Sequence, residues 1–181
     1  MITETQELKA STREGYQILL RAEARLLLPV GKPKICDFYQ RLARTCVSWA
    51  EEIHGERLRR EFCALETVRE KSRFRTQYYR FCMYSPWEEG RYAVILCESE
   101  LTGQWEEIHN SYHRISHVWD VEEELLLPPS QILSAFGVNL SRDMLPFRPD
   151  GIYPTEDGIV LFRNPTPSSV FIEKKLPRAK A

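Results

Sequence analysis

Hydrophobic and polar residues alternate almost strictly between residues 16 and 28 of this sequence. The apolar residues occupy every second position: Tyr16, Ile18, Leu20, Ala22, Ala24, Leu26 and Leu28. A period of two is typical of a strand with one buried face and one solvated face. Pro29 ends the pattern. Residues 1–14 are polar and show no clear period, so we expect them to form a flexible N-terminal arm.

A helical pattern follows the strand. Apolar residues recur at spacings of three and four, which is typical of one face of an amphipathic helix: Ile35, Phe38, Tyr39, Leu42, Ala43, Cys46, Trp49, Ala50 and Ile53. Gly55 stands where a helix C-terminus usually has glycine, so the pattern predicts that the helix ends there. The charge-rich residues 56–71 predict a second helix at the periphery, with its charges in solvent.

The middle of the chain predicts an antiparallel meander. Residues 73–85 and 91–102 are rich in strand-forming residues and flank a loop of hairpin length at residues 86–90. Residues 105–119 continue as a third strand. Farther on, Ser130 is suited to cap a short helix over residues 131–136, which Gly137 would close.

The closing stretch, residues 147–165, has the strongest local signal of the chain. Asp157 and Gly158 lie between two β-type segments, a pattern that predicts a hairpin. The segment at residues 159–162 is apolar without interruption, which is typical of a strand covered on both faces. We therefore expect a central strand here, with the other elements packed around it. Residues 170–172 predict a last edge strand.

Together these elements predict an α+β fold with two layers, in which a long amphipathic helix packs on a mainly antiparallel sheet beside one or two shorter helices. The length of 181 residues suits a single domain. We place that domain at residues 15–174, between the arm at residues 1–14 and a basic tail at residues 175–181.

Composition narrows the class of protein. The net charge of −1 argues against a nucleic-acid-binding protein, which would present a basic face. No apolar window is long enough to predict a membrane span, and the N-terminus shows no signal-peptide pattern, so we expect a cytoplasmic protein. Five cysteines without a C-x-x-C pair indicate neither a zinc site nor a disulfide framework.

The order of these parts resembles a known family. The helix carries Phe38 and Tyr39, the meander ends in Trp119 and Asp120, and the closing stretch from residue 153 to residue 165 ends in Asn164 and Pro165. This arrangement resembles the C-terminal domain of unknown function of the RsiV anti-sigma factors, which also occurs in peptidoglycan deacetylases of the PdaC type. The resemblance covers roughly residues 16–172. It implies a helix packed on an antiparallel sheet and a sensor that recognises lysozyme, but it assigns no binding residue to this chain.

Three histidines are the sharpest candidates for chemistry. His109, His113 and His117 are spaced four residues apart. On a helix, two of them with Glu106 would suit a metal site. On a strand they share one face, but neighbours lie about 13 Å apart, which is too far for one ion. The alternation of Trp105, Ile115 and Trp119 favours the strand, and with it a solvated or partner-facing surface; we therefore expect no metal and no cofactor.

No nucleophile elbow, P-loop or dinucleotide-binding motif occurs in the sequence. The sequence therefore favours a non-catalytic binding or sensor module over an enzyme, with a protein or a small ligand as its partner. The candidate binding residues are Trp87, Trp105, His109, Tyr112, His113 and His117. The alternatives are a metal-assisted hydrolase on the face of the three histidines and a structural partner with no ligand of its own.

Overall fold

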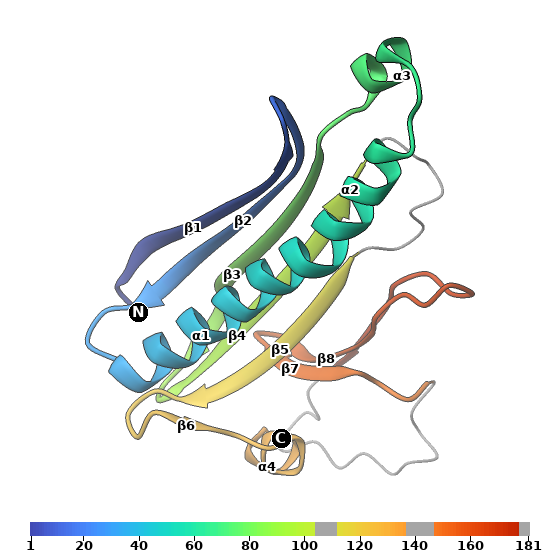
Figure 1. Cartoon of the computed structure of the whole chain (residues 1–181). Helices are drawn as coiled ribbons and strands as arrows, with labels where there is room; N and C mark the ends of the chain where they lie inside the picture. Colours follow the sequence, from blue (N-terminus) through green and yellow to red (C-terminus); the bar gives the residue numbers. More distant parts are fainter. Residues whose placement is uncertain (104–111, 137–146, 178–181) are drawn as a thin grey trace.

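The computed structural model describes residues 1–103, 112–136 and 147–177 (Figure 1). Six strands form a curled sheet in the order β1 to β6, and three more form a second sheet in the order β7, β8, β9. The first sheet consists of β1 (Thr3–Glu14), β2 (Gln17–Pro29), β3 (Gln77–Glu89), β4 (Tyr92–Thr102), β5 (His113–Asp120) and β6 (Leu125–Leu126), and the second of β7 (Gly151–Thr155), β8 (Gly158–Arg163) and β9 (Ile172–Pro177). The helical elements are α1 (Pro33–Trp49), the π-helical η1 (Ala50–Gly55), α2 (Glu56–Cys63), α3 (Val68–Arg73) and α4 (Pro129–Ala135).

The predicted two-layer α+β class, with one long helix on one mainly antiparallel sheet, is wrong. The described part of the chain is mostly β, with about 49% of the described residues in strands and 28% in helices, and it has two sheets instead of one. Two segments account for the difference: residues 3–14 form a strand, and the three C-terminal strands form a sheet of their own. Among the described strands, β2 and β3 are the one parallel pair; all the other neighbours are antiparallel.

The two faces of the six-stranded sheet are covered by different elements. Alternate residues of β4 enter different clusters: Ile95 and Cys97 join the core under α1, and Val94 and Leu96 join the core shared with β7 and β8. Figure 1 shows α1, η1 and α2 running as one continuous helical segment along the sheet, and the C-terminal sheet lying beside β5. We call the face under this segment the helix side, and the other the opposite face.

The helix beginning near Ile35 is confirmed, but its predicted end at Gly55 is wrong. The helical segment continues for 31 residues, because η1 joins α1 directly to α2. Gly55 has a φ of −62°, an ordinary helical value, so it is not a terminating residue. Its role is to allow close approach: a Cβ at this position would lie 2.2 Å from Oγ1 of Thr12 in β1. Glycine lets the helical segment pass directly over the first hairpin.

The π-helical turn also explains which part of the predicted apolar stripe leaves the core. Ile35, Tyr39 and Ala43 are buried, as the period of α1 predicts. Residues in η1 advance by i→i+5 bonding, which changes the phase of the helix by a fraction of a turn. Ile53, which lies within η1, is 54% exposed after this shift, whereas Trp49, the last residue of α1, is already 46% exposed before it.

Residues 3–14, which we expected to be a flexible arm, pair with β2 along their whole length. The sequence pattern did not predict this strand because only Leu8 and Ala10 are apolar on the face that meets the core. The strand predicted from residue 16 is confirmed from Gln17 onward, and it ends at Pro29 as expected. Tyr16 instead occupies the exposed turn between β1 and β2.

The hairpin around Asp157 and Gly158 is confirmed as β7 and β8. Residues 159–162 are buried, but β8 is the middle strand of the small sheet and not the centre of the whole fold. The last strand, β9, begins at Ile172 and includes Lys174 and Lys175, so the strand lies later than predicted. Among the described residues, no helix combines the length and apolar content that crossing a bilayer requires.

Candidate ligand-binding site

A pocket of about 440 Å³ lies between the helical segment and the sheet. Its helical wall carries one residue from nearly every turn: Cys46, Trp49, His54 and Arg57. Its floor comes from three adjacent strands: Tyr79, Phe81, Cys97, Ser99, Leu101, His113 and Ile115. Phe, Leu, Ile and Trp make the body of the pocket apolar, while the histidines and the arginine add polar groups.

Strand register explains how the floor is assembled. Phe81 lies opposite Ser99, and Ser99 lies opposite His113, so these three form one row across β3, β4 and β5. Residues two apart on a strand face the same way. Every floor residue is odd-numbered, and the pairing of odd with odd places them all on the helix side.

The helical wall depends on η1. π-helical turns inside helices are often associated with functional sites. Here the turn places the ring of His54 edge-on against Trp49, with centroids 4.8 Å apart and planes at 89°. Trp49 in turn lies edge-on to Tyr79, at 6.3 Å. Burial lowers the pKa of His54, and the nearby positive charge of Arg57 lowers it further. His54 is therefore a neutral imidazole at pH 7.

The guanidinium of Arg57 supplies the positive charge of the pocket. It donates a hydrogen bond to Oε1 of the buried Gln77 at 3.2 Å. It also forms an ion pair with Glu61, one turn farther along the helix, at 3.6 Å. Arg57 is thus held in place by one neutral and one acidic partner, and 45% of its side chain remains exposed. The guanidinium has five N–H donors, so these two contacts leave donors for a ligand.

The thiols and the phenol of the pocket are protonated. Burial raises the pKa of Cys46, although a hydrogen bond with Tyr79 offsets part of the effect. Burial also raises the pKa values of Tyr79 and Cys97. Since the thiolate is the reactive form of cysteine, these groups serve as apolar and hydrogen-bonding surface, not as nucleophiles.

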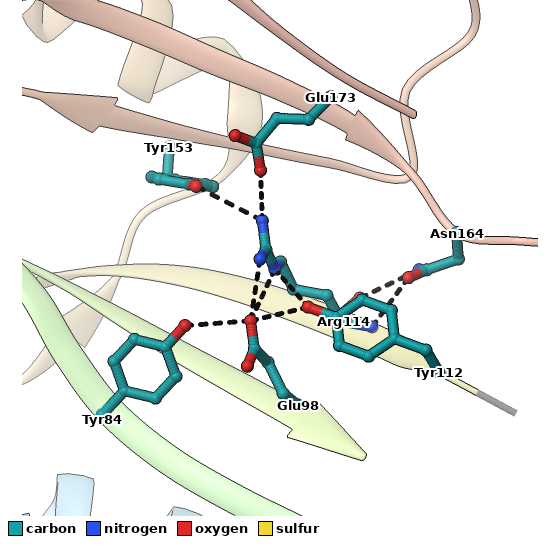
Figure 2. A network of polar contacts seen from close by, with 7 residues as sticks. All are labelled: Tyr84, Glu98, Tyr112, Arg114, Tyr153, Asn164 and Glu173. Carbon is teal, nitrogen blue, oxygen red and sulfur yellow. Dashed lines mark hydrogen bonds and ion pairs between the residues drawn. The ribbon is translucent and has the colours of Figure 1, made fainter. Parts of the chain in front are cut away.

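A second polar cluster joins the two sheets on the opposite face (Figure 2). Arg114 of β5 donates from Nε to Glu98 of β4 at 2.9 Å, and it forms an ion pair with Glu173 of β9. The Tyr84 and Tyr112 hydroxyls donate to the same Glu98 oxygen at 2.9 and 2.7 Å. Burial would raise the pKa of Glu98, but the two hydroxyls and Arg114 outweigh it and lower the pKa.

The Arg114 cluster is a structural joint. The guanidinium also lies over the ring of Phe171, 4.8 Å from its centroid. Asn164 accepts a hydrogen bond from the Arg114 backbone amide at 2.7 Å and donates one to its carbonyl at 2.9 Å. Asn164 belongs to the end of the closing stretch, which carries the family resemblance. Its two hydrogen bonds therefore connect the end of β8 to β5. The polar groups of the Arg114 cluster bond to one another, whereas in the pocket Arg57 keeps N–H donors that a ligand could use.

The predicted site residues do not form one site. His113 lines the pocket, Tyr112 belongs to the Arg114 cluster, and the half-buried Trp87 packs edge-on against Phe136 at 5.4 Å. His117 is half-buried against Tyr39 instead of facing solvent as expected, because α1 covers this part of β5. Trp105 and His109 lie outside the described residues.

His113 and His117 share the helix side, as a strand requires, but they have different neighbours. Within residues 1–103, 112–136 and 147–177, no group of three or more His, Cys, Asp or Glu side chains is placed to hold a metal ion. Sequence reasoning missed the pocket because its walls come from segments far apart in the chain. The one local signal was the grouping of Trp49, His54 and Arg57 near the end of the apolar stripe.

Comparison with known proteins identifies structural neighbours only. No protein-family profile matches the chain, and no curated protein matches it in sequence. A DUF3298 family protein from Pseudomonas aeruginosa has a similar fold, with a TM-score of 0.55, 14% identity, and coverage of 97% of this chain and 90% of that chain. A DUF3298 member from Bacteroides fragilis aligns with a TM-score of 0.46, 10% identity and the same coverage. The first likeness shows a shared fold.

Proposed function

We propose that this chain is a non-catalytic binding module of the RsiV C-terminal type that holds a small ligand in the pocket between η1 and the sheet. The observation that carries the proposal is the pocket itself, in which an apolar body meets His54, Arg57 and His113. Its volume of about 440 Å³ is in the range of small-molecule sites, which are mostly apolar and have a few convergent polar groups. The resemblance of the closing stretch to the RsiV family is the ground for the type of module, and the fold is shared with a DUF3298 family protein.

The lining indicates the chemistry of the ligand. Among the described residues that line the pocket there is no Asp or Glu, while Arg57 carries a positive charge. A carboxylate accepts charge-assisted hydrogen bonds from a guanidinium with good geometry. Phe81, Leu101 and Ile115 suit a flat or branched apolar body. We therefore propose a small aromatic or aliphatic acid, with its carboxylate toward Arg57.

Calorimetric titration with a panel of small aromatic and aliphatic acids tests this proposal, when each acid is paired with its neutral amide. Acids should bind and amides should not. Arg57→Gln should weaken binding about tenfold or more, since a hydrogen bond to a charged group contributes about 1.5–3 kcal/mol. Arg60→Gln, on the exposed side of the same helix, is the matched control and should bind as the wild type does.

A second pair of variants tests the apolar wall. Trp49→Ala removes a ring that lines the pocket, and Ile53→Ala removes a similarly exposed side chain one turn away that does not line it. Only the first should lower affinity. If no acid binds, or if binding is equal in Trp49→Ala, Arg57→Gln and their controls, the pocket is not the site.

A further inference from the structure

The outer edge of β1 is long, and no other strand of the described residues pairs with it. Within this part of the chain, the six-stranded sheet ends at β1, and β2 is its one neighbour. Proteins commonly block such edges with proline, a short strand, charged side chains, or a charge pointing inward. β1 spans 12 residues without a proline, and its one irregularity in register lies near its end, between Thr12 and Arg13. The strand does carry charges, but they are of both signs, so the edge is open to a partner that sets opposite charges against them.

The pairing with β2 determines which backbone groups face outward. Val30 donates its amide to the carbonyl of Ile2 at 2.9 Å, one position beyond the pair of Thr3 with Pro29. In an antiparallel ladder, hydrogen-bonded and non-bonded residue pairs alternate. The even-numbered residues of β1 therefore form the backbone hydrogen bonds to β2. Pro29 has no amide hydrogen, and it lies opposite Thr3 in a pair without hydrogen bonds. The odd-numbered residues from Thr3 to Ser11 direct their amides and carbonyls to the open edge.

The sequence of this edge is complementary to itself. An antiparallel copy related by a two-fold axis at Leu8 places Glu7 opposite Lys9 twice, and Thr5 opposite Ser11 twice. Both members of each pair are odd-numbered, so their outward amides and carbonyls meet. Glu7 and Lys9 are 52% and 62% exposed, and they now pair with each other within one strand at 2.8 Å. Their charges are thus available for cross-strand pairs, which stabilise sheets.

Other registers fit less well. An axis at residue 7 sets Glu7 against itself, and an axis at residue 9 sets Lys9 against itself; like charges directly opposite one another destabilise a pair. A two-fold axis between two residues would place each odd-numbered residue opposite an even-numbered one. The backbone groups of the odd-numbered residue face the open edge, but those of the even-numbered residue already bond to β2. The register at Leu8 also uses the whole length of the strand and brings Leu8, half-buried on the helix side, against its counterpart.

We propose that this chain forms a two-fold dimer through the open edge of β1, with the antiparallel strands centred on Leu8 so that one sheet continues through both copies. Sedimentation equilibrium of the full chain should show a dimer. Glu7→Lys and Lys9→Glu each oppose like charges, and should each raise the dissociation constant about tenfold or more.

Mixing the two variants provides the sharper test. In the mixed pair, the two lysines of one chain face the two glutamates of the other, so a heterodimer should form with near wild-type affinity. The ion pair within each strand is lost in both variants, so it cannot explain such a recovery. A mixture that stays monomeric, or a wild type that is monomeric throughout the concentration series, overturns the proposal.

A cross-link measures the register directly. Opposed residues in a non-bonded antiparallel pair have Cα atoms about 4.5 Å apart, within disulfide range. In a background of Cys63→Ser and Cys82→Ser, which removes the two exposed thiols, Leu8→Cys should form a covalent dimer on oxidation. Ala10→Cys should not, because its copies would lie four residues apart. Equal cross-linking of the two variants would contradict the register.

Discussion

The hydroxyl of Tyr39 lies between His117 and Trp119, 3.0 Å from Nδ1 of His117 and 2.8 Å from Nε1 of Trp119. The indole N–H can only donate, so the Tyr39 oxygen accepts from Trp119 and its own proton is free to go to His117. When this proton is donated to Nδ1, His117 is a neutral imidazole protonated at Nε2. Burial of this ring lowers the pKa of His117 to about 4.

This arrangement predicts a loss of stability in mild acid. The unfolded state takes up a proton at His117 near pH 6.5, and the folded state does so only near pH 4. The stabilisation that the neutral His117 gives the folded state is therefore complete above pH 6.5. As the pH falls toward 4, the free energy of unfolding decreases by at most about 3 kcal/mol. Urea denaturation at pH 7.5 and pH 4.5 measures the effect. His117→Gln, which keeps an acceptor for Tyr39, should show a smaller decrease; an equal decrease would show that other groups are responsible.

Gly55→Ala should destabilise the protein, although helix propensity alone predicts the reverse by about 1 kcal/mol. The added methyl would lie 2.2 Å from Oγ1 of Thr12, and such overpacking costs about 1–3 kcal/mol. Thermal denaturation should show recovery in the double variant Gly55→Ala with Thr12→Ala, measured against Thr12→Ala alone. A stabilising Gly55→Ala would mean that the helical segment does not approach β1 so closely.

Arg114→Met should be among the most damaging single changes. The side chain of Arg114 is 14% exposed, and its removal leaves the carboxylate of Glu98 without its cation. Breaking a fully buried ion pair on one side costs about 3–5 kcal/mol, and the loss for this part-buried pair should lie below that range. Glu173→Gln, at the more exposed end of the same cluster, should cost about 1 kcal/mol or less. Chemical denaturation that gives similar losses for both variants would contradict the role of Arg114 as the joint.

Asn164→Ala should loosen the small sheet more than the large one. Asn164 makes one hydrogen bond to the amide and one to the carbonyl of Arg114, and it is buried. Leaving buried backbone groups without partners costs about 1–3 kcal/mol. Hydrogen exchange should accelerate at β7 and β8 while protection at β2 and β3 is kept. Uniform acceleration would show that the two sheets unfold as one unit.

The elements predicted well were those with a strong local signal. The helix from Ile35 follows from a regular apolar stripe, and the hairpin at Asp157 and Gly158 follows from turn chemistry. The first strand was missed because hydrogen bonding to β2, and not apolar content, determines its conformation. Gly55 was misread because a glycine required for close approach looks the same in sequence as one that ends a helix.

The candidate site was less accessible to sequence reasoning. Of the predicted binding residues among the described ones, only His113 lines the pocket. The correct alternation on β5 identified the face of His113 and His117, but nothing local indicates that α1 covers one histidine and that η1 lies near the other. The site depends on a π-helical turn and on three strands brought into register, and both are properties of the tertiary structure.

The parallel pairing of β2 with β3 has a consequence for how the molecule assembles. The first hairpin needs only a short turn, but β3 reaches β2 only after the chain has passed through α1, η1, α2 and α3. Contacts between distant parts of a sequence carry a larger loop-closure entropy and slow the search for the native state. Until β3 docks, the hairpin exposes both of its edges, so a newly made chain is most vulnerable to misassociation during that interval.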